Sequence, residues 1–190
     1  MSGGVWLVRH GALPPDPEGR MVGARDIALS ATGRAQARAL ARGFMPGLRG
    51  RLCAVITSDL SRCRETAALL LEHFEPVPLH VEPGLREISL GRWEGLTREE
   101  IEIRWPGAHA ARGRDMGDFV PPGGESFAAV QRRALDALAR WRQRYPQGAL
   151  LCVAHAGVLR VLLARYLALP LDEVLRIPQH YACRCFLPEW

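Results

Sequence analysis

The chain has 190 residues, 48% of them hydrophobic, and a formal net charge of +5 at pH 7. A chain of this length and composition suits one globular domain, residues 1–190, that folds without a disulfide or a structural metal. It contains no apolar stretch of about 18 residues, the length that would indicate a membrane span, and its five cysteines form no CxxC pair. We therefore expect a cytoplasmic protein with reduced thiols, no metal and no membrane partner.

All 25 basic residues are arginine. Arg34, Arg38 and Arg42 recur every four residues opposite an apolar stripe, which is typical of the solvated face of a helix. The positive charge therefore does not by itself indicate a nucleic-acid partner, and it is equally compatible with an anionic small molecule.

The first third of the chain alternates apolar runs with helical patterns. Val5–Val8 is predicted to be a short buried strand, and a helix begins near Ser30 or Thr32, either of which can cap it, and runs to about Phe44. Cys53–Thr57 predicts a second strand. Apolar residues three and four positions apart over residues 60–74 then predict a second helix.

The middle of the chain departs from this alternation. A short strand is predicted at Leu79–Val81. The stretch from about residue 83 to residue 125 is rich in glycine, proline, tryptophan and charged residues. We predict that it is a lid-like insertion, with one short helix at Thr97–Arg104, that lies over the functional site.

The last third returns to the regular alternation. Helices are predicted over residues 127–145 and Val158–Ala168, with a strand at Leu150–Ala154 between them and a final, edge strand at Tyr181–Leu187. Strands that alternate with helices predict an α/β fold with a mostly parallel sheet covered on both faces. Ligands bind at the carboxyl ends of the strands in such sheets.

Two histidines follow predicted strands directly. His10 lies in the sequence Leu7-Val-Arg-His-Gly11, and His155 lies in Val153-Ala-His-Ala-Gly157. A neutral imidazole is a good nucleophile toward phosphorus, and a backbone carbonyl that fixes one ring nitrogen presents the other for attack. Arg9 beside His10 supplies a cationic fork that matches phosphate oxygens. Covalent phosphoryl transfer through a histidine would need two histidines at strand ends with an arginine beside them, as His10, His155 and Arg9 are arranged here.

A second phosphate-binding element is predicted after the strand that ends at Thr57. Ser58 follows that strand, and Arg62 lies in the first turn of the next helix, where a cation is disfavoured unless an anion is present. A general acid is also required, and Glu87, Glu94 and Glu125 are candidates that the residues alone do not rank.

Five motifs occur in order along nearly the whole chain, and together they resemble the histidine phosphatase superfamily, which also contains the cofactor-dependent phosphoglycerate mutases. The motifs are Leu7-Val-Arg-His-Gly11, Ser58-Asp-Leu-x-Arg62, Leu85-x-Glu-x-x-x-Gly-x-Trp-Glu-Gly95, Gly124-Glu-Ser126 and Val153-x-His-x-Gly157. The Gly-x-Trp-Glu-Gly segment and the short chain resemble the phosphatase branch, which includes α-ribazole phosphatases and broad-specificity phosphatases.

The resemblance implies a three-layer α/β/α sandwich with a mixed sheet and neither metal nor cofactor. It implies that His10 is the nucleophile that becomes phosphohistidine, that Arg9, Arg62 and His155 form the phosphate pocket, and that Glu87 is the proton donor and later the base. The expected substrate is a small phosphorylated metabolite, hydrolysed to inorganic phosphate. A phosphoglycerate mutase and a non-catalytic phosphate-binding scaffold are the alternatives.

The chain departs from the family pattern at one place. Many members follow Arg-His-Gly with Glu-Thr, whereas this chain has Ala12-Leu13. That change removes a hydroxyl group from the expected phosphate pocket. Arg20, Arg25 and Ser58 are the candidates to compensate for this loss, and Ser58 is also expected among the phosphate-binding residues.

Overall fold

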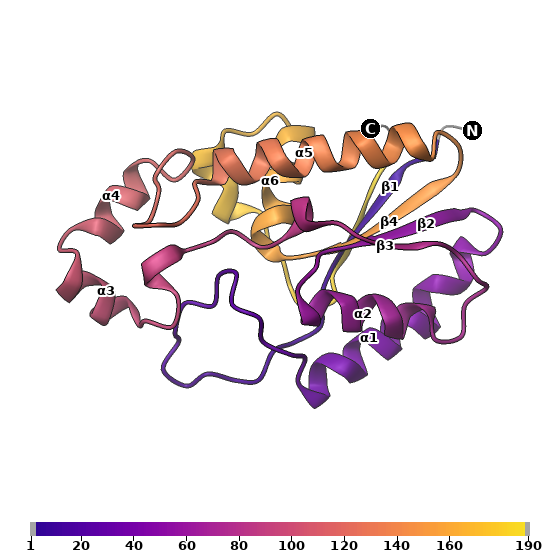
Figure 1. Ribbon diagram of the computed structural model, residues 1–190, viewed down its shortest axis with the longest axis horizontal. Helices are drawn as coiled ribbons and strands as arrows, with labels where there is room; N and C mark the ends of the chain where they lie inside the picture. The colour runs from indigo at the N-terminus through magenta and orange to yellow at the C-terminus, as the bar shows by residue number, and fades with distance from the viewer. Residues whose placement is uncertain (1–2, 189–190) are drawn as a thin grey trace.

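The computed structural model describes residues 3–188, which form a five-stranded sheet between two layers of helices (Figure 1). The strand order is β3-β2-β4-β1-β5, and β1 to β4 run parallel while β5 runs antiparallel to β1. The predicted mixed α/β sandwich is therefore confirmed. The strands are β1 (Val5–Arg9), β2 (Leu52–Thr57), β3 (Leu79–Val81), β4 (Ala149–Ala154) and β5 (Arg184–Leu187).

The helices cover the two faces of the sheet in pairs (Figure 1). Helices α1 (Ala31–Phe44) and α2 (Ser61–Leu71) cover one face, and α5 (Phe127–Arg144) and α6 (Ala156–Tyr166) cover the other. Because side chains alternate along a strand, Leu7 joins the apolar cluster under α5 and α6, while Val8 joins the cluster under α1 and α2. This double burial explains why the parallel strands are continuous apolar runs.

Serine side chains cap the beginnings of two helices, and the first of them, Ser30, is one of the two caps predicted from the sequence. Ser30 accepts a hydrogen bond from Gly33 N at 3.0 Å and so caps α1. Ser126 accepts from Ala129 N at 3.1 Å and caps α5. Short 3-10 helices connect other elements: η1 (Met45–Leu48), η2 (Pro83–Leu85), η3 (Gly91–Trp93) and η4 (Leu171–Arg176).

Two predicted boundaries near the C-terminal end were wrong. The strand expected at Tyr181–Leu187 begins only at Arg184, because Cys183 N–H donates to His180 O at 3.1 Å and Ala182 has a left-handed φ of 55°. The helix expected at Val158–Ala168 begins two residues earlier, directly after His155, and Ala168, with a φ of 53°, lies beyond its end.

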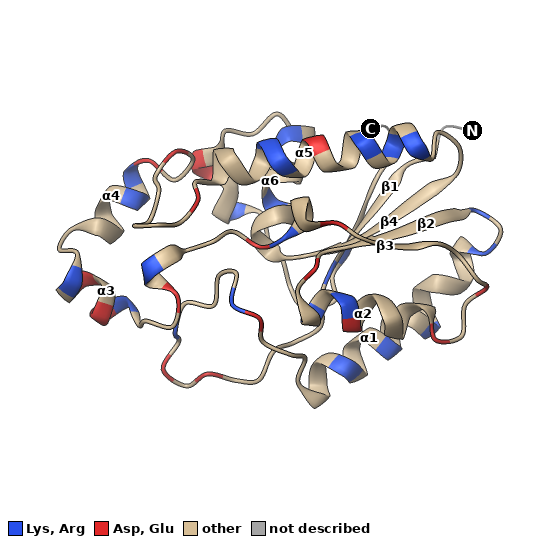
Figure 2. Cartoon of the chain, in the orientation of Figure 1, with Lys and Arg blue, Asp and Glu red and all other residues tan. Residues whose placement is uncertain are grey.

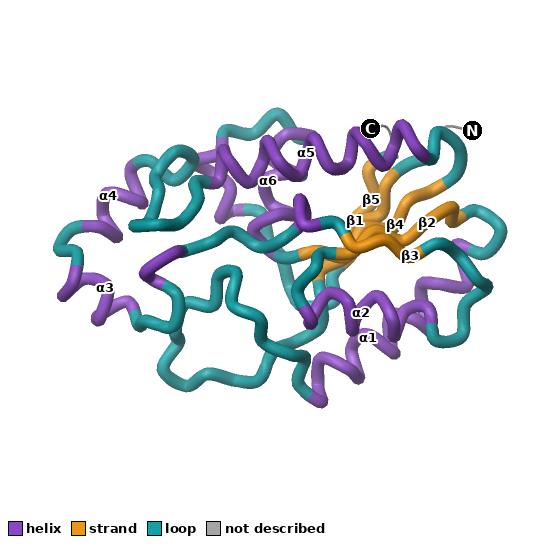
Figure 3. The backbone as a smooth tube through the Cα atoms, in the orientation of Figure 1, coloured by secondary structure: helices purple, strands orange, loops and turns teal. Residues whose placement is uncertain are grey.

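The segment 83–125 holds, besides η2 and η3, two α-helices rather than the single helix expected. Helix α3 (Arg98–Arg104) is the helix predicted at Thr97–Arg104, and it begins with a capping box formed by Thr97 and Glu100. Helix α4 (Ala108–Arg114) was not predicted, because it contains no apolar stripe and buries none of its residues. Figure 3 shows both helices (purple) beyond the end of the sheet, on the side of the carboxyl ends of the parallel strands. The described part of the chain contains no helix of the length and apolarity that crossing a bilayer requires.

Candidate active site

His10 lies at the carboxyl end of β1, between β4 and the loop that leads to β5. Its backbone N–H donates to Ala154 O at 3.1 Å, and its carbonyl accepts from Ala182 N at 3.1 Å. The side chain is 3% exposed. Backbone hydrogen bonds on both sides therefore hold the imidazole at the end of the sheet where ligands of α/β proteins bind.

The ring of His10 is oriented by its neighbour. Nδ1 lies 2.7 Å from Gly11 O and donates to it, which leaves Nε2 unprotonated with an open lone pair. Burial lowers the pKa of His10 from 6.5 to about 3; the hydrogen bond to Gly11 opposes this shift, and the positive charges of Arg62 and Arg9 add to it. The imidazole is thus a neutral base, which is the nucleophilic form.

His155 lies against His10, with ring centroids 5.2 Å apart, and is completely buried. Arg62 Nε donates to its Nδ1 at 3.1 Å, and its Nε2 contacts Ser58 Oγ at 2.8 Å. Burial, reinforced by the charge of Arg62, holds the pKa of His155 well below 6.5. The structure brings Ser58 onto His155, and direct contact of Ser58 with phosphate stays a prediction.

Arg62 is a buried cation in the first turn of α2. Its Nη2 donates to Gly23 O at 3.0 Å and its Nη1 to Arg25 O at 2.5 Å, both from the segment that follows His10. Burial lowers the pKa of Arg62. A guanidinium at the positive end of a helix dipole, close to two neutral histidines, leaves the site with excess positive potential.

Arg9 projects toward the loop before β5. Its Nη1 donates to Gln179 O, and its guanidinium carbon lies 3.9 Å from the centroid of the Tyr181 ring. Within residues 3–188, Arg9 Nε is buried without a hydrogen-bond partner. Sequence reasoning missed Gln179 and Tyr181, which carry no motif and lie about 170 positions from Arg9.

The geometry separates the three glutamates that the sequence left open. Glu87 Oε2 accepts from Gly157 N at 3.1 Å, in the first turn of α6, just after His155. Glu94 Oε1 accepts from the backbone N–H groups of Ala24 and Leu90 at 2.8 and 3.0 Å and so joins two loops.

Glu125 is held ionised by Arg133, which donates to it at 2.9 Å. Burial of Glu125 acts to raise its pKa, but the hydrogen bonds from Arg133 and Ser89 N–H outweigh that effect and lower it. Glu87 is therefore the one of the three carboxyls that bonds to the turn following His155.

In this chain, which has Ala12-Leu13 in place of Glu-Thr, hydrogen bonds and ion pairs with other side chains hold the segment that follows Gly11. Ala12 N–H donates to Gln36 Oε1 at 2.8 Å. Arg20 forms ion pairs with Glu18 and, at 2.8 Å, with Glu100. Its guanidinium therefore binds these carboxylates and not the phosphate site. The expectation that Arg20 compensates for Ala12-Leu13 is therefore wrong, because its guanidinium already has carboxylate partners.

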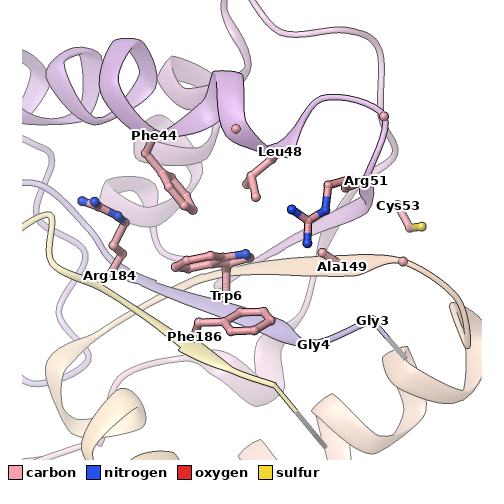
Figure 4. A pocket seen from close by; sticks show the side chains of 13 residues that line it. Gly3, Gly4, Trp6, Phe44, Leu48, Arg51, Cys53, Ala149, Arg184 and Phe186 are labelled. Atoms are coloured by element: carbon pink, nitrogen blue, oxygen red, sulfur yellow. The ribbon is translucent and has the colours of Figure 1, made fainter. Parts of the chain in front are cut away.

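A cavity of about 350 Å³ adjoins Glu87, with Gly157 at the beginning of α6 among its lining residues. A second cavity of about 510 Å³ lies at the amino ends of the strands, where Trp6, Phe44 and Phe186 line it (Figure 4). No predicted site residue lines this second cavity. Glu87 is the predicted site residue that lines the first cavity.

Basic residues are dispersed over several helices. Figure 2 shows them on α1, α2, α4 and α5, with acidic residues also present on α2 and α5. Among the described residues, no cluster of three or more His, Cys, Asp or Glu side chains could hold a metal ion.

Comparisons with known proteins identify the family. The model of the histidine phosphatase superfamily (branch 1) matches residues 5–188. An adenosylcobalamin/alpha-ribazole phosphatase of Salmonella typhimurium is 36% identical over 171 residues, covering 87% of this chain and 80% of the relative. A metal-independent phosphoserine phosphatase of Arabidopsis thaliana is 34% identical over 163 residues, covering 85% of this chain and 67% of the relative. The solved structure of mycobacterial glucosyl-3-phosphoglycerate phosphatase with VO3 has a TM-score of 0.82 and 32% identity, covering 97% of this chain and 92% of that one. The chain belongs to branch 1 of the histidine phosphatase superfamily, as its motifs indicate, and it is a phosphatase like these relatives.

Proposed function

We propose that the protein hydrolyses a small phosphomonoester through a phosphohistidine on His10. The observation that carries this proposal is the open lone pair of His10 Nε2, since Nδ1 donates to Gly11 O at 2.7 Å. Nε2 attacks phosphorus while the bond from phosphorus to the leaving oxygen breaks. Glu87, as the carboxylic acid, donates its proton to that oxygen.

In the second half of the reaction water replaces the leaving group. The Glu87 carboxylate accepts a proton from water, and the water oxygen attacks the phosphorus of phosphohistidine. The bond between phosphorus and His10 Nε2 breaks, and inorganic phosphate leaves. Glu87 is then again an acid, so no proton is gained or lost by the enzyme over the cycle.

Arg9 and Arg62 hold the phosphoryl oxygens in this proposal, and His155 joins them when its Nε2–H turns from Ser58 Oγ to a phosphoryl oxygen. Two guanidinium groups supply the charge that a metal ion supplies in other phosphatases. Arg62 is fixed by His155 and by the carbonyls of Gly23 and Arg25. Ser58 acts on the phosphate through His155, because its hydroxyl fixes the orientation of that ring.

Hydrolysis is favoured over phosphoglycerate mutation and over a non-catalytic scaffold. A binding scaffold needs no neutral, oriented nucleophile such as His10. A mutase must keep water away from phosphohistidine, and the segment 83–125 contains loosely packed glycine turns at Gly107 and Gly123, where an added Cβ would meet no heavy atom within 4 Å. The substrate is a small phosphorylated metabolite, and the five cysteines, all free thiols, support a cytoplasmic location.

The test is to trap the intermediate. The enzyme is mixed with a ³²P-labelled phosphomonoester, quenched in alkali, and digested for mapping. We expect label on His10 that is stable to base and labile to acid, and none in His10→Ala. His73→Ala is the matched control, because His73 is exposed at the end of α2. Label on a serine, aspartate or cysteine, or full turnover in His10→Ala, would refute the proposal.

A further inference from the structure

The peptide unit between Gly11 and Ala12 carries the carbonyl that orients the ring of His10. Gly11 O accepts a hydrogen bond from His10 Nδ1 at 2.7 Å. The N–H of the same peptide unit belongs to Ala12, and it donates to Gln36 Oε1 at 2.8 Å. The carbonyl and the N–H of one peptide unit lie in one rigid plane, because the C–N bond has partial double-bond character. Gln36 therefore fixes the plane whose carbonyl oxygen fixes the His10 ring.

Helix α1 brings Gln36 to this peptide through a close backbone contact. A Cβ atom added at Gly11 would collide with Gly33 O, and one added at Gly33 would collide with Ala12 O. Two glycines thus allow the first turn of α1 to lie directly against the loop, and Ser30 N–H donates to Ala12 O at 2.9 Å. Gln36 follows Gly33 by three residues, so both lie on the helix face that meets the loop.

The preceding peptide unit, between His10 and Gly11, is held by different groups. Its N–H, on Gly11, donates to Thr66 Oγ1 at 3.2 Å, and its carbonyl, on His10, accepts from Ala182 N at 3.1 Å. These two bonds position the main chain at the end of β1, but neither involves the Gly11 carbonyl. Within residues 3–188, Gln36 is the one side chain besides His10 that bonds to the peptide unit with that carbonyl. Gln36 thus acts on the ring separately from the main-chain anchors.

We propose that Gln36 is a positioning residue for the nucleophile: its side-chain oxygen holds the Gly11–Ala12 peptide and so keeps the proton of His10 on Nδ1 and the lone pair on Nε2. This inference rests on the proposed function, in which Nε2 attacks phosphorus. An acceptor on the N–H of a peptide polarises its carbonyl and strengthens the hydrogen bond that the carbonyl accepts. Without that acceptor the tautomer protonated on Nε2 becomes more populated, and this tautomer has no lone pair on Nε2 for attack.

The test compares Gln36→Met with Gln36→Glu. Methionine has about the length of glutamine without its acceptor oxygen, glutamate keeps an acceptor oxygen, and all three have similar helix propensities. ¹⁵N NMR of histidine-labelled enzyme reports which ring nitrogen carries the proton, and the signals of His10 are identified by their loss in His10→Asn. We expect well-separated Nδ1 and Nε2 signals in the wild type and in Gln36→Glu, and signals shifted toward one another in Gln36→Met.

The rate of phosphohistidine formation supplies the second readout. One hydrogen bond corresponds to about a 2- to 10-fold change in an equilibrium constant. Single-turnover labelling of His10 at saturating substrate should slow by this factor in Gln36→Met and recover in Gln36→Glu. The loss should be equal for glycerol 3-phosphate and 4-nitrophenyl phosphate, because the population of the reactive tautomer does not depend on the leaving group. Arg42→Met, an exposed arginine of the same helix, should leave both readouts unchanged.

The outcomes separate this inference from the function on which it rests. Wild-type ring signals and a wild-type labelling rate in Gln36→Met overturn the inference alone. A slower rate with unchanged ring signals, in a variant that urea titration shows to be folded, assigns Gln36 a structural role and also overturns it. A loss of rate that Gln36→Glu does not recover has the same meaning. Absence of label on wild-type His10 overturns both proposals.

Discussion

The close approach of Glu87 to Gly157 allows the proposed general acid to be displaced without altering its chemistry. A Cβ atom added at Gly157 would lie 2.4 Å from Glu87 Oε1 and 3.2 Å from its carboxyl carbon. To reach ordinary van der Waals distance, the carboxyl oxygen must move by about 1 Å. Gly157→Ala therefore retains a carboxylic acid in the site but places it incorrectly for proton donation.

The size of the effect follows from that displacement. A misplacement of about 1 Å can cost about 100-fold in rate, and a general acid contributes about 10²- to 10⁴-fold in total. We expect kcat for glycerol 3-phosphate to fall about 100-fold in Gly157→Ala, and at least as far in Glu87→Gln. The loss should be less than about tenfold for 4-nitrophenyl phosphate, whose leaving group needs little protonation.

A matched control and a double variant complete the test. Gly43 lies in α1 with no heavy atom within 4 Å of an added Cβ, so Gly43→Ala should leave turnover of both substrates unchanged. In the Glu87→Gln background, Gly157→Ala should add little further loss, because both changes act on one group. Full activity of Gly157→Ala, equal losses for the two substrates, or additive losses in the double variant would refute the role of Glu87.

Three further outcomes are expected. Because burial lowers the pKa of His10 from 6.5 to about 3, the unfolded chain binds a proton that the folded chain does not bind between these values. The free energy of unfolding should therefore fall as the pH drops from 6.5 toward 3. Urea titrations of His10→Asn should show a smaller fall over this range, and an equal fall in the variant and the wild type would contradict the lowered pKa of His10. Turnover should survive dialysis against a strong chelator, because in the proposed mechanism Arg9 and Arg62 supply the positive charge. A loss of turnover that zinc or magnesium restores would show that the reaction needs a metal ion. With 3-phosphoglycerate, release of inorganic phosphate should exceed formation of 2-phosphoglycerate in a coupled assay, and the reverse ratio would favour a mutase.

The sheet and the positions of His10 and His155 could be predicted because local pattern and topology agree. Apolar runs fix the strands, and the rule that ligands bind at the carboxyl ends of parallel strands selects His10 and His155 from the six histidines of the chain. Both lie where β1 and β4 end, and the structure brings their rings to 5.2 Å. Arg62 follows from the same reasoning, since the next helix begins where β2 ends.

The other contacts of the site are tertiary contacts, which produce no periodic pattern in the sequence. Tyr181 contacts Arg9 from a turn in which Ala182 has a left-handed backbone conformation. This conformation is uncommon for alanine, so the sequence does not predict the turn. Helix α4, which lines the cavity beside Glu87, has seven residues and buries none of them, so it lacks an amphipathic pattern. The choice of Glu87 over Glu94 and Glu125 rests on which backbone N–H groups each carboxyl meets, and only tertiary structure determines those partners.

The position of β4 in the middle of the sheet has a consequence for how the protein is synthesised. β4 lies between β2 and β1, so these two earlier strands do not contact each other without it. During translation, Val5 and Leu7 of β1 therefore remain unpaired until residues 149–154 have left the ribosome. Pairing over so long a separation is slow and leaves apolar segments open to aggregation and to chaperones. No shorter nascent chain can bring His10 to His155, so the enzyme acquires its chemistry only in the last stage of folding.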